Sequence, residues 1–507
     1  MMTDLLLALP MAIIVIGAFV LLLLSRSKRL NLHRLNIITV FFLTLSFTIQ
    51  YIVIDDHSST FLFPDIFGTN FILDNFSKIF DFMFTVGAIL TLLINNDYFK
   101  SRNYFNGEYF ALILFSVFGM MMLSHAHELV TAFIALEISS LSVYTLVGYH
   151  KNNKISSEAM MKYMVLGAMT GAFFLLGTAL IYGAVGSTTL IDIAMYVRNN
   201  EGQDMTLLLV GLSFIMITIM FKIGAVPFHS WVVDVYHGAP YPITMFMAST
   251  FKIAIFAIAL RLYLVHLEPI HSFWIEILQV ITVLTLLGGS WLAINQTIVK
   301  RMLSGSSIVH SGYLLIAMSS LGLGSEVAAP AIMFYLIAYF LSAVGSFGIL
   351  SFLSAQSKKQ MTYDDFKGFA QRRPYMALIM SIFMLSLAGF PSTIGFLGKF
   401  YIFTSAIESG QILLAGFGIL IAFISVYYYF KLIAMMYFYP SETPEKKVTI
   451  DISTVCIAIM ALFVIWGGIG TSLLSFIPGA DGLIDIAKQT INSLKQAPTG
   501  NQIIFVL

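Results

Sequence analysis

Residues 221–231 read FKIGAVPFHSW, and residues 388–400 read AGFPSTIGFLGKF. Each stretch interrupts a run of apolar residues with glycine and proline, and each carries a lysine, Lys222 or Lys399. Proline inside a helix breaks the hydrogen-bond ladder, and in lipid such a break is tolerated only where it lines a cavity or is buried in protein. Two similar breaks in corresponding halves indicate a transporter built from inverted repeats, with its site near the membrane midplane.

The composition of the 507-residue chain is that of a membrane protein. Hydrophobic residues make up 58% and charged residues 10%, and the mean hydropathy is +0.89. Soluble domains contain about 25% charged residues, so an ordinary globular fold is excluded. The net charge of +1 and the lack of a basic patch give no indication of a nucleic-acid partner. The single cysteine, Cys456, excludes an internal disulfide and a cysteine-ligated iron–sulfur cluster.

Windows of about 20 apolar residues predict about fourteen spans. They run 4–25, 36–54, 77–97, 109–124, 128–149, 161–184, 206–226, 240–265, 273–293, 302–320, 330–354, 375–407, 411–438 and 450–476. We therefore expect an all-α polytopic membrane protein with two inverted five-helix repeats and two broken helices. The expected single membrane domain, 1–507, divides into N-terminal helices (1–108), a first repeat (109–265), a second repeat (273–438), and a last helix with an amphipathic tail (450–507).

The distribution of basic residues predicts the orientation. The loops on one side of these spans carry 17 of the 27 Lys and Arg residues, whereas the other side, termini included, carries four. By the positive-inside rule the first side is cytoplasmic, which places both termini outside.

Charged residues within spans are the strongest indication of function. Lys222, Lys252 and Lys399 lie deep in apolar stretches, and the acidic Glu137 lies midway along another. A charge at the bilayer centre costs between about 2.5 and 17 kcal/mol, so such residues mark ion or proton paths by default. The alternative for Glu137 and Lys222 is a static buried ion pair.

Five stretches carry a specific resemblance. They are ALEISSLSVYTLVGY (135–149), SSEAMMKYMVLGAMTGAFFLLGTALIYGAVGS (156–187), FKIGAVPFHSWVVDVYHGAPYPITMFMASTFKIAIF (221–256), KRMLSGSSIVHSGYLLIAM (300–318) and GFPSTIGFLGKFYIF (389–403). Together they resemble the subunit N family of bacterial proton-pumping NADH-quinone oxidoreductase, complex I, which is similar to mitochondrial subunit 2 and belongs to the wider antiporter-like group. The sequence departs from the family pattern at Val232 and Val233, where Thr and Pro are usual, and at His237, where Glu or Gln is usual.

The resemblance implies roles for single residues. Glu137 would pair with Lys222, and Lys252 would continue a lateral proton relay toward Lys399. Burial disfavours the charged form of a group and a nearby opposite charge favours it, so the protonation of Lys222 should depend on its distance from Glu137. Lys399 is expected to face a wet cavity rather than a carboxylate.

Other polar residues have two possible interpretations each. Lys162 and Lys431 are either proton-relay residues or lysines that extend to the surface. His229 and His310 are either relay residues, since histidine titrates near neutrality, or buried hydrogen-bonding groups. We interpret Arg261 and Asp81 as extending to the membrane surface, and His125, His127 and Glu128 as interfacial.

The resemblance also implies partners, cofactors and location. We expect this chain to bind no cofactor itself, with quinone, FMN and iron–sulfur clusters elsewhere in the complex. Its partners would be other membrane subunits, the peripheral redox arm through them, and lipids, in a bacterial inner membrane. The main alternative is a subunit of an Mrp-type cation/proton antiporter, and a third interpretation is a structural subunit that no longer pumps.

Overall fold

The computed structural model describes residues 2–26, 31–53, 61–62, 70–200, 204–357, 359–441, 451–469 and 478–495. Nearly all described residues are helical, and one antiparallel pair of two-residue strands, β1 (Phe61–Leu62) and β2 (Ile72–Leu73), joins Phe61 to Leu73. The all-α membrane fold predicted from hydropathy is therefore confirmed.

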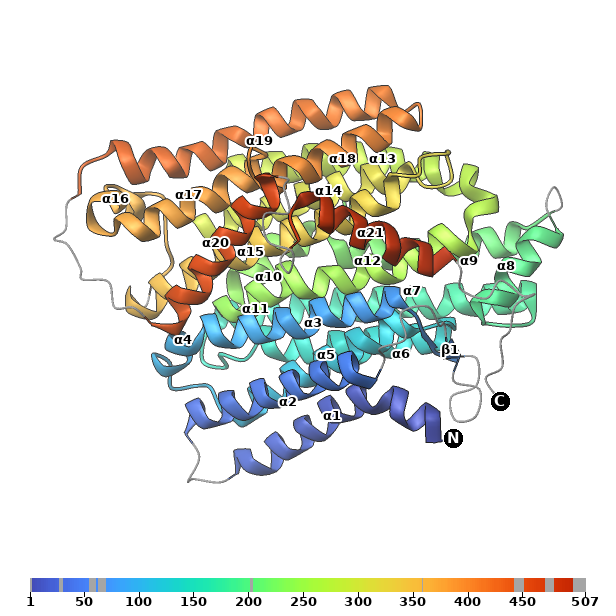
Figure 1. The fold of residues 1–507 in the computed structure, drawn as a ribbon, viewed down its shortest axis with the longest axis horizontal. Helices are drawn as coiled ribbons and strands as arrows, with labels where there is room; N and C mark the ends of the chain where they lie inside the picture. Colours follow the sequence, from blue (N-terminus) through green and yellow to red (C-terminus); the bar gives the residue numbers. More distant parts are fainter. Residues whose placement is uncertain are drawn as a thin grey trace.

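The helices run mostly side by side in one bundle (Figure 1). The first half contains α1 (Met2–Ser25), α2 (Leu32–Val53), α3 (Asn75–Ile94), α4 (Asn96–Lys100), α5 (Gly107–His125), α6 (Leu129–Val147), α7 (Lys154–Val185), α8 (Leu190–Asn199), α9 (Thr206–Ile223), α10 (Ser230–Gly238), α11 (Tyr241–Phe246), η2 (Met247–Phe251), α12 (Lys252–Leu260), η3 (Arg261–His266) and η4 (Glu268–Ile270). The second half contains α13 (His271–Ile294), α14 (Val299–Ser319), α15 (Ala328–Ser357), η5 (Asp364–Phe366), α16 (Phe369–Arg372), α17 (Pro374–Ala388), α18 (Ile394–Glu408), α19 (Ile412–Phe438), α20 (Ile452–Ile469) and α21 (Ala480–Lys495).

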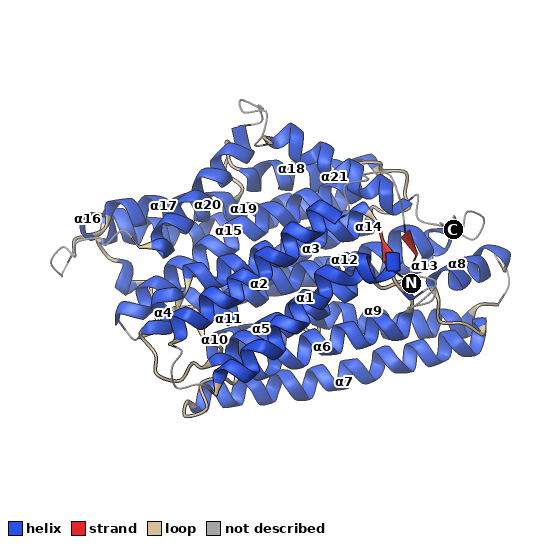
Figure 2. Ribbon diagram, turned by 60° about the horizontal axis from the view of Figure 1, so that its bottom comes forward, coloured by secondary structure: helices blue, strands red, loops and turns tan. Residues whose placement is uncertain are grey.

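Among the described residues, twelve helical segments are long and apolar enough to cross a membrane. The two other predicted spans are not among these twelve segments, and each has a physical reason. The span at 302–320 is α14, a 21-residue helix whose serines lower its hydropathy. The span at 375–407 is divided into α17 and α18, each too short to cross alone. Figure 2 shows the longest helix, α7, along one edge of the bundle.

The centre of the bundle is formed by residues that lipid does not reach. Residues 241–263 are all buried, and between residues 299 and 320 only Arg301 is more than slightly exposed. A helix buried on every side can carry polar groups on more than one face, provided that protein partners receive them. The serine-rich α14 is such a helix, and it contacts α13, α15, α18 and α19.

The two helix breaks follow the same local rule. Helix α9 ends at Gly224 (φ 74°), and α17 ends at Gly389 (φ 85°). Glycine is favoured there because side chains rarely adopt the left-handed conformation that ends a helix. A proline follows each break, Pro227 after the first and Pro391 after the second. Both breaks were predicted from the sequence, whereas the inverted relation of the two repeats and the domain limits stay predictions.

Several charged residues that we placed at the surface are buried. Arg261 is 1% exposed, and its guanidinium donates two hydrogen bonds to Asp74, at 2.9 and 3.1 Å, and two to the carbonyl of Ser124. Asp81 is also buried, and it accepts hydrogen bonds from Ser124 and Gln50 and contacts the His125 ring at 2.8 Å. The surface interpretation was wrong because these groups form hydrogen bonds with one another between α2, the start of α3, α5 and η3. The sequence of a single span does not reveal contacts between helices.

The neighbouring residues His127 and Glu128 lie between the end of α5 and the start of α6, so the edge of a span was predicted correctly. Both are buried in protein, and Glu128 accepts hydrogen bonds from Val130 and Thr131 at the start of α6. The amphipathic tail was predicted correctly: α21 buries Ile484, Ile491 and Leu494 while contacting α3 and α15.

Replacing Gly389 with Ala should destabilise the fold by about 1–2 kcal/mol, because φ is positive and the added Cβ would lie 2.8 Å from Lys399 Cδ. The matched control is Gly416→Ala on α19, where nothing lies within 4 Å of the added Cβ. Thermal unfolding in detergent should show a loss for the first variant only. Equal melting temperatures for both variants would contradict the strain at the break.

The pH dependence of stability should include a contribution from His127. Burial and, to a smaller extent, the Arg261 charge lower the pKa of His127 to about 4, although Asp74 opposes them. As the pH falls, His127 is protonated in the unfolded chain before it is protonated in the folded one. Its contribution to the free energy of unfolding is therefore complete above the usual histidine pKa and is lost as the pH decreases toward 4. The expected loss is about 2 kcal/mol between pH 7 and pH 5. His127→Gln should flatten the pH dependence of the melting temperature, and His33→Gln, at an exposed position, should leave it unchanged.

Candidate functional site

The first buried lysine lies at the end of α9, two residues before the break. Lys222 is 2% exposed, and its Nζ donates hydrogen bonds to Ser140 Oγ at 2.7 Å and Tyr144 Oη at 3.0 Å. Tyr144 in turn packs against Gly167 of α7, where a Cβ would clash with the phenol oxygen. The ammonium is therefore held by neutral oxygens on α6.

Glu137 lies one turn before Ser140 on α6 but does not bond directly to Lys222. Within the described part of the chain, no carboxylate oxygen of Glu137 lies within 4.0 Å of Lys222 Nζ. Instead the carboxylate packs on Gly171 of α7, and its buried Oε1 has no hydrogen-bond partner among the described residues. The direct pair implied by the family resemblance is not present in this conformation.

The second buried lysine begins α12, directly after the π-helical turn η2. All three donors of the Lys252 ammonium are satisfied by α14: Ser307 O at 2.7 Å, Ser307 Oγ at 2.6 Å and Ser311 Oγ at 3.0 Å. Ser311 Oγ donates in turn to Ile223 O at 2.8 Å. One hydroxyl thus joins Lys252 to the residue that follows Lys222.

A histidine and several tyrosines occupy the next face of α14. His310 is 3% exposed, and its ring nitrogens lie 2.6 Å from Tyr335 Oη and 3.0 Å from Tyr429 Oη. The Tyr339 ring contacts both His310 and Lys252: its centroid is 4.8 Å from the His310 ring centroid and 5.4 Å from Lys252 Nζ. His310 therefore has a hydrogen-bond partner on each side.

The third buried lysine closes the second break. Lys399 is 4% exposed, and its Nζ donates to the carbonyls of Leu387 at 2.9 Å and Ala388 at 2.8 Å, the last residues of α17. The end of a helix leaves carbonyls unpaired and carries a partial negative charge, so a cation is stabilised there. The Tyr313 ring lies 4.8 Å from the same Nζ. Lys399 thus has no carboxylate partner among the described residues, as expected, but it binds carbonyls rather than facing an open cavity.

The polar groups of α14 form two stripes. Ser307 and Ser311 bind Lys252, and Ser304 follows on the same side of the helix. Ser306, His310 and Tyr313 face α15, α18 and α19. Spacings of three and four residues place each set on one side of the helix. Helix α14 therefore connects the lysine after the first break with the lysine after the second.

Comparisons with known proteins identify the family of this chain. The transmembrane family described as NADH:quinone oxidoreductase/Mrp antiporter matches residues 126–425. A protein of Trichlorobacter lovleyi named NADH-quinone oxidoreductase subunit N is 39% identical over 420 residues, covering 82% of this chain and 86% of the relative. The chain belongs to the NADH-quinone oxidoreductase subunit N family.

Solved structures show the same fold. A chain of respiratory complex I from Thermus thermophilus, with bound aureothin, is 27% identical with a TM-score of 0.75, and the match covers 90% of this chain and 96% of that one. A chain of the Mrp complex from Dietzia sp. is 17% identical with a TM-score of 0.82, covering 98% of both. The second likeness shows the fold alone.

Three other residues singled out from the sequence lie outside the series of buried lysines formed by Lys222, Lys252 and Lys399. Lys162 is 43% exposed and pairs with Glu158 at 2.7 Å and Asp234 at 3.2 Å. Lys431 lies 4.5 Å from the Tyr363 ring, and His229 is a half-buried residue just before α10. The surface interpretation thus fits Lys162, while the relay role of all three stays a prediction.

The tyrosines of the site were missed from the sequence. Tyr144, Tyr335, Tyr339 and Tyr429 each contact a lysine or His310. Their spacing on α15, four residues apart at 335 and 339, was the available signal, but aromatic residues in spans are usually packing residues.

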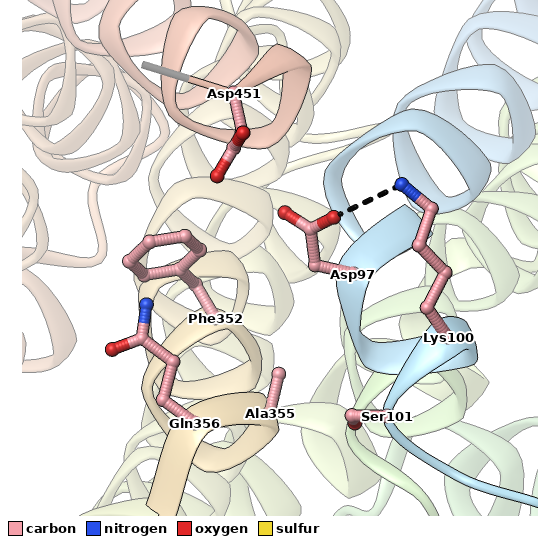
Figure 3. A pocket seen from close by; sticks show the side chains of 7 residues that line it. All are labelled: Asp97, Lys100, Ser101, Phe352, Ala355, Gln356 and Asp451. Carbon is pink, nitrogen blue, oxygen red and sulfur yellow. Dashed lines mark hydrogen bonds and ion pairs between the residues drawn. The ribbon is translucent and has the colours of Figure 1, made fainter. Parts of the chain in front are cut away.

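A cavity of about 340 Å³ lies away from this chain of lysines. It is lined by Asp97, Lys100, Ser101, Phe352, Ala355, Gln356 and Asp451. Figure 3 shows the Asp97 and Asp451 carboxylates facing the same space, with Lys100 paired to Asp97 at 3.4 Å. None of its lining residues belongs to the relay.

Proposed function

We propose that this subunit N chain is a proton-translocating membrane subunit of a respiratory NADH-quinone oxidoreductase. The observation that carries this proposal is the series of buried lysines at both helix breaks, joined through α14 by hydroxyl and imidazole groups. Each ammonium is bound by neutral oxygens, so each is able to lose its proton without leaving a carboxylate unpaired. Flavin, iron–sulfur and quinone chemistry would belong to other subunits.

Proton movement would begin with a change at Glu137. If the carboxylate turned from Gly171 toward Lys222, the opposite charge would favour the ammonium, and its return would favour release of a proton. The unpartnered Oε1 of Glu137 and the Ser140 and Tyr144 contacts of Lys222 provide two alternative arrangements among the described residues. Electron transfer elsewhere in the complex would shift the balance between them.

Lateral transfer would use Ser311 and then His310. Ser311 accepts a hydrogen bond from Lys252 and donates one to the carbonyl of Ile223, so it holds the Lys252 ammonium beside the end of α9. A carbonyl only accepts, so the proton itself would pass between the two lysine sites through water at the first break. A neutral imidazole between two phenols donates from one nitrogen and accepts at the other, and exchanging these roles moves a proton across the ring. Tyr335 then leads to Lys399, because its ring packs on Gly398 beside it.

The orientation follows from the basic loops. Helices α4 and α16, whose last turns carry Lys100 and Arg372, lie at one end of the bundle, whereas α1 begins and α21 ends toward the other (Figure 1). With the positive-inside rule, we infer that the α4 and α16 end faces the cytoplasm and that both termini lie outside, in a bacterial inner membrane.

The Mrp-type antiporter is the less supported alternative, because the curated relatives are subunits N and the likeness to the Mrp complex shows the fold alone. Purification in mild detergent separates the two functions. Recovery of the chain with a redox arm and quinone-dependent pumping supports our proposal, whereas transport without quinone or electron donor supports the antiporter.

Lys222→Ala, Lys252→Ala and Lys399→Ala should each reduce quinone-coupled pumping, on the order of tenfold, because each removes a proton carrier. Lys399→Arg should lose as much as Lys399→Ala, since arginine keeps the charge and essentially never deprotonates. Lys151→Ala, at an exposed position, is the control. The measurement is the proton-to-electron ratio in inverted vesicles with assembly verified. A Lys399→Arg variant that pumps normally would show that a fixed charge is sufficient and would overturn the relay role.

A further inference from the structure

A fourth buried lysine lies near the start of α14. Lys300 is 1% exposed, and its Nζ donates to Ala239 O at 2.6 Å and to His237 O at 3.3 Å, at the end of α10. The Tyr241 ring centroid lies 4.3 Å from the same atom. Two carbonyls at a helix C-terminus and the face of a tyrosine also hold Lys399. The two lysines thus have the same kind of surroundings.

Lys300 shares a face of α14 with the serines that bind Lys252. Positions 300, 304, 307 and 311 are separated by four, three and four residues, so these side chains follow one side of the helix. Ser304 lies between Lys300 and the Lys252 site, and its hydroxyl donates to Lys300 O. The hydroxyls of Tyr236 and Tyr339 face Ser307 from α10 and α15. Two helical turns, about 10 Å along the axis, separate Lys300 from Ser307.

The other side of Lys300 approaches solvent. Arg301 is the half-exposed residue next to it, and it pairs with Asp234 at 3.2 Å, whose carboxylate is 43% exposed. The His237 imidazole is close enough to Lys300, Arg301 and Asp234 to respond to their charges. Burial and the charges of Lys300 and Arg301 lower the pKa of His237 to about 4, although Asp234 opposes them. The imidazole is therefore neutral near pH 7, and it has a buried Nδ1 without a hydrogen-bond partner in the described structure.

We propose that Lys300 is the proton-uptake residue of the α4 and α16 end, which delivers protons along α14 to Lys252. The ammonium of Lys300 loses a proton to the hydroxyls of Ser304 and Ser307, and these pass a proton to neutral Lys252. A proton from the solvent side, by way of Asp234 and His237, then restores the Lys300 ammonium. One N–H bond breaks on Lys300 and one forms on Lys252, so the charge moves with the proton. This inference rests on the proposed function.

The opposing explanation is that Lys300 only caps α10. Variants that differ in titration separate the two explanations: Lys300→Gln and Lys300→Arg donate hydrogen bonds to the α10 carbonyls but do not release a proton near neutral pH. Lys300→His both donates and titrates. Lys151→Gln, which removes an exposed charge outside α14 and outside the proposed route, is the control.

The test is proton pumping and quinone reduction by the intact complex in inverted vesicles. Lys300→Gln and Lys300→Arg should pump on the order of tenfold more slowly, while Lys300→His recovers much of the rate. Equal pumping by Lys300→Gln, Lys300→Arg and Lys300→His, whether normal or reduced, would overturn the uptake role and show that Lys300 only caps α10. If Lys300→Arg does not assemble, the comparison of Lys300→Gln with Lys300→His decides between the two explanations. Normal pumping by Lys300→Gln with loss in Lys252→Ala would reject this inference alone, whereas normal pumping by Lys252→Ala would reject the proposed function itself.

Discussion

Burying a lysine without a carboxylate partner is the constraint on which this structure depends. Lys222, Lys252 and Lys399 each donate only to hydroxyls or carbonyls within the described residues. Hydrogen bonds donated to neutral oxygens stabilise an ammonium enough to bury it, but they do not fix its charge as a buried carboxylate would. The serines of α14, the broken helices and the tyrosines can all be understood as sources of such oxygens.

The contrast with Arg261 supports this interpretation. Its guanidinium is matched to Asp74 by two hydrogen bonds, and arginine essentially never deprotonates. Burial alone would raise the pKa of Asp74, but the charge and hydrogen bonds of Arg261 outweigh burial and hold it below its usual value. The same bundle therefore contains a permanent ion pair where charge is fixed and lysines with neutral partners where protons are proposed to move.

Much of this arrangement was predictable from the sequence, but not all of it. Glycine and proline located both breaks, and single lysines in apolar runs located the chain of charges, because these signals are local. The pairing of Arg261 with Asp74 and the distance between Glu137 and Lys222 depend on how separate helices pack, which hydropathy does not contain. Lys300 was among the 17 basic residues assigned to loops, because the predicted span begins at residue 302 whereas α14 begins at Val299.

The central claim is that α14 joins the two lysine sites, and Ser311 tests it most directly. Its hydroxyl connects Lys252 to the end of α9, while Ser319 on the same helix binds Gln411 away from the lysines. The measurement is the proton-to-electron ratio of Ser311→Ala beside Ser319→Ala in sealed vesicles. The account predicts a lower ratio for Ser311→Ala with quinone reduction retained and no change for Ser319→Ala. An unchanged ratio in Ser311→Ala would contradict it.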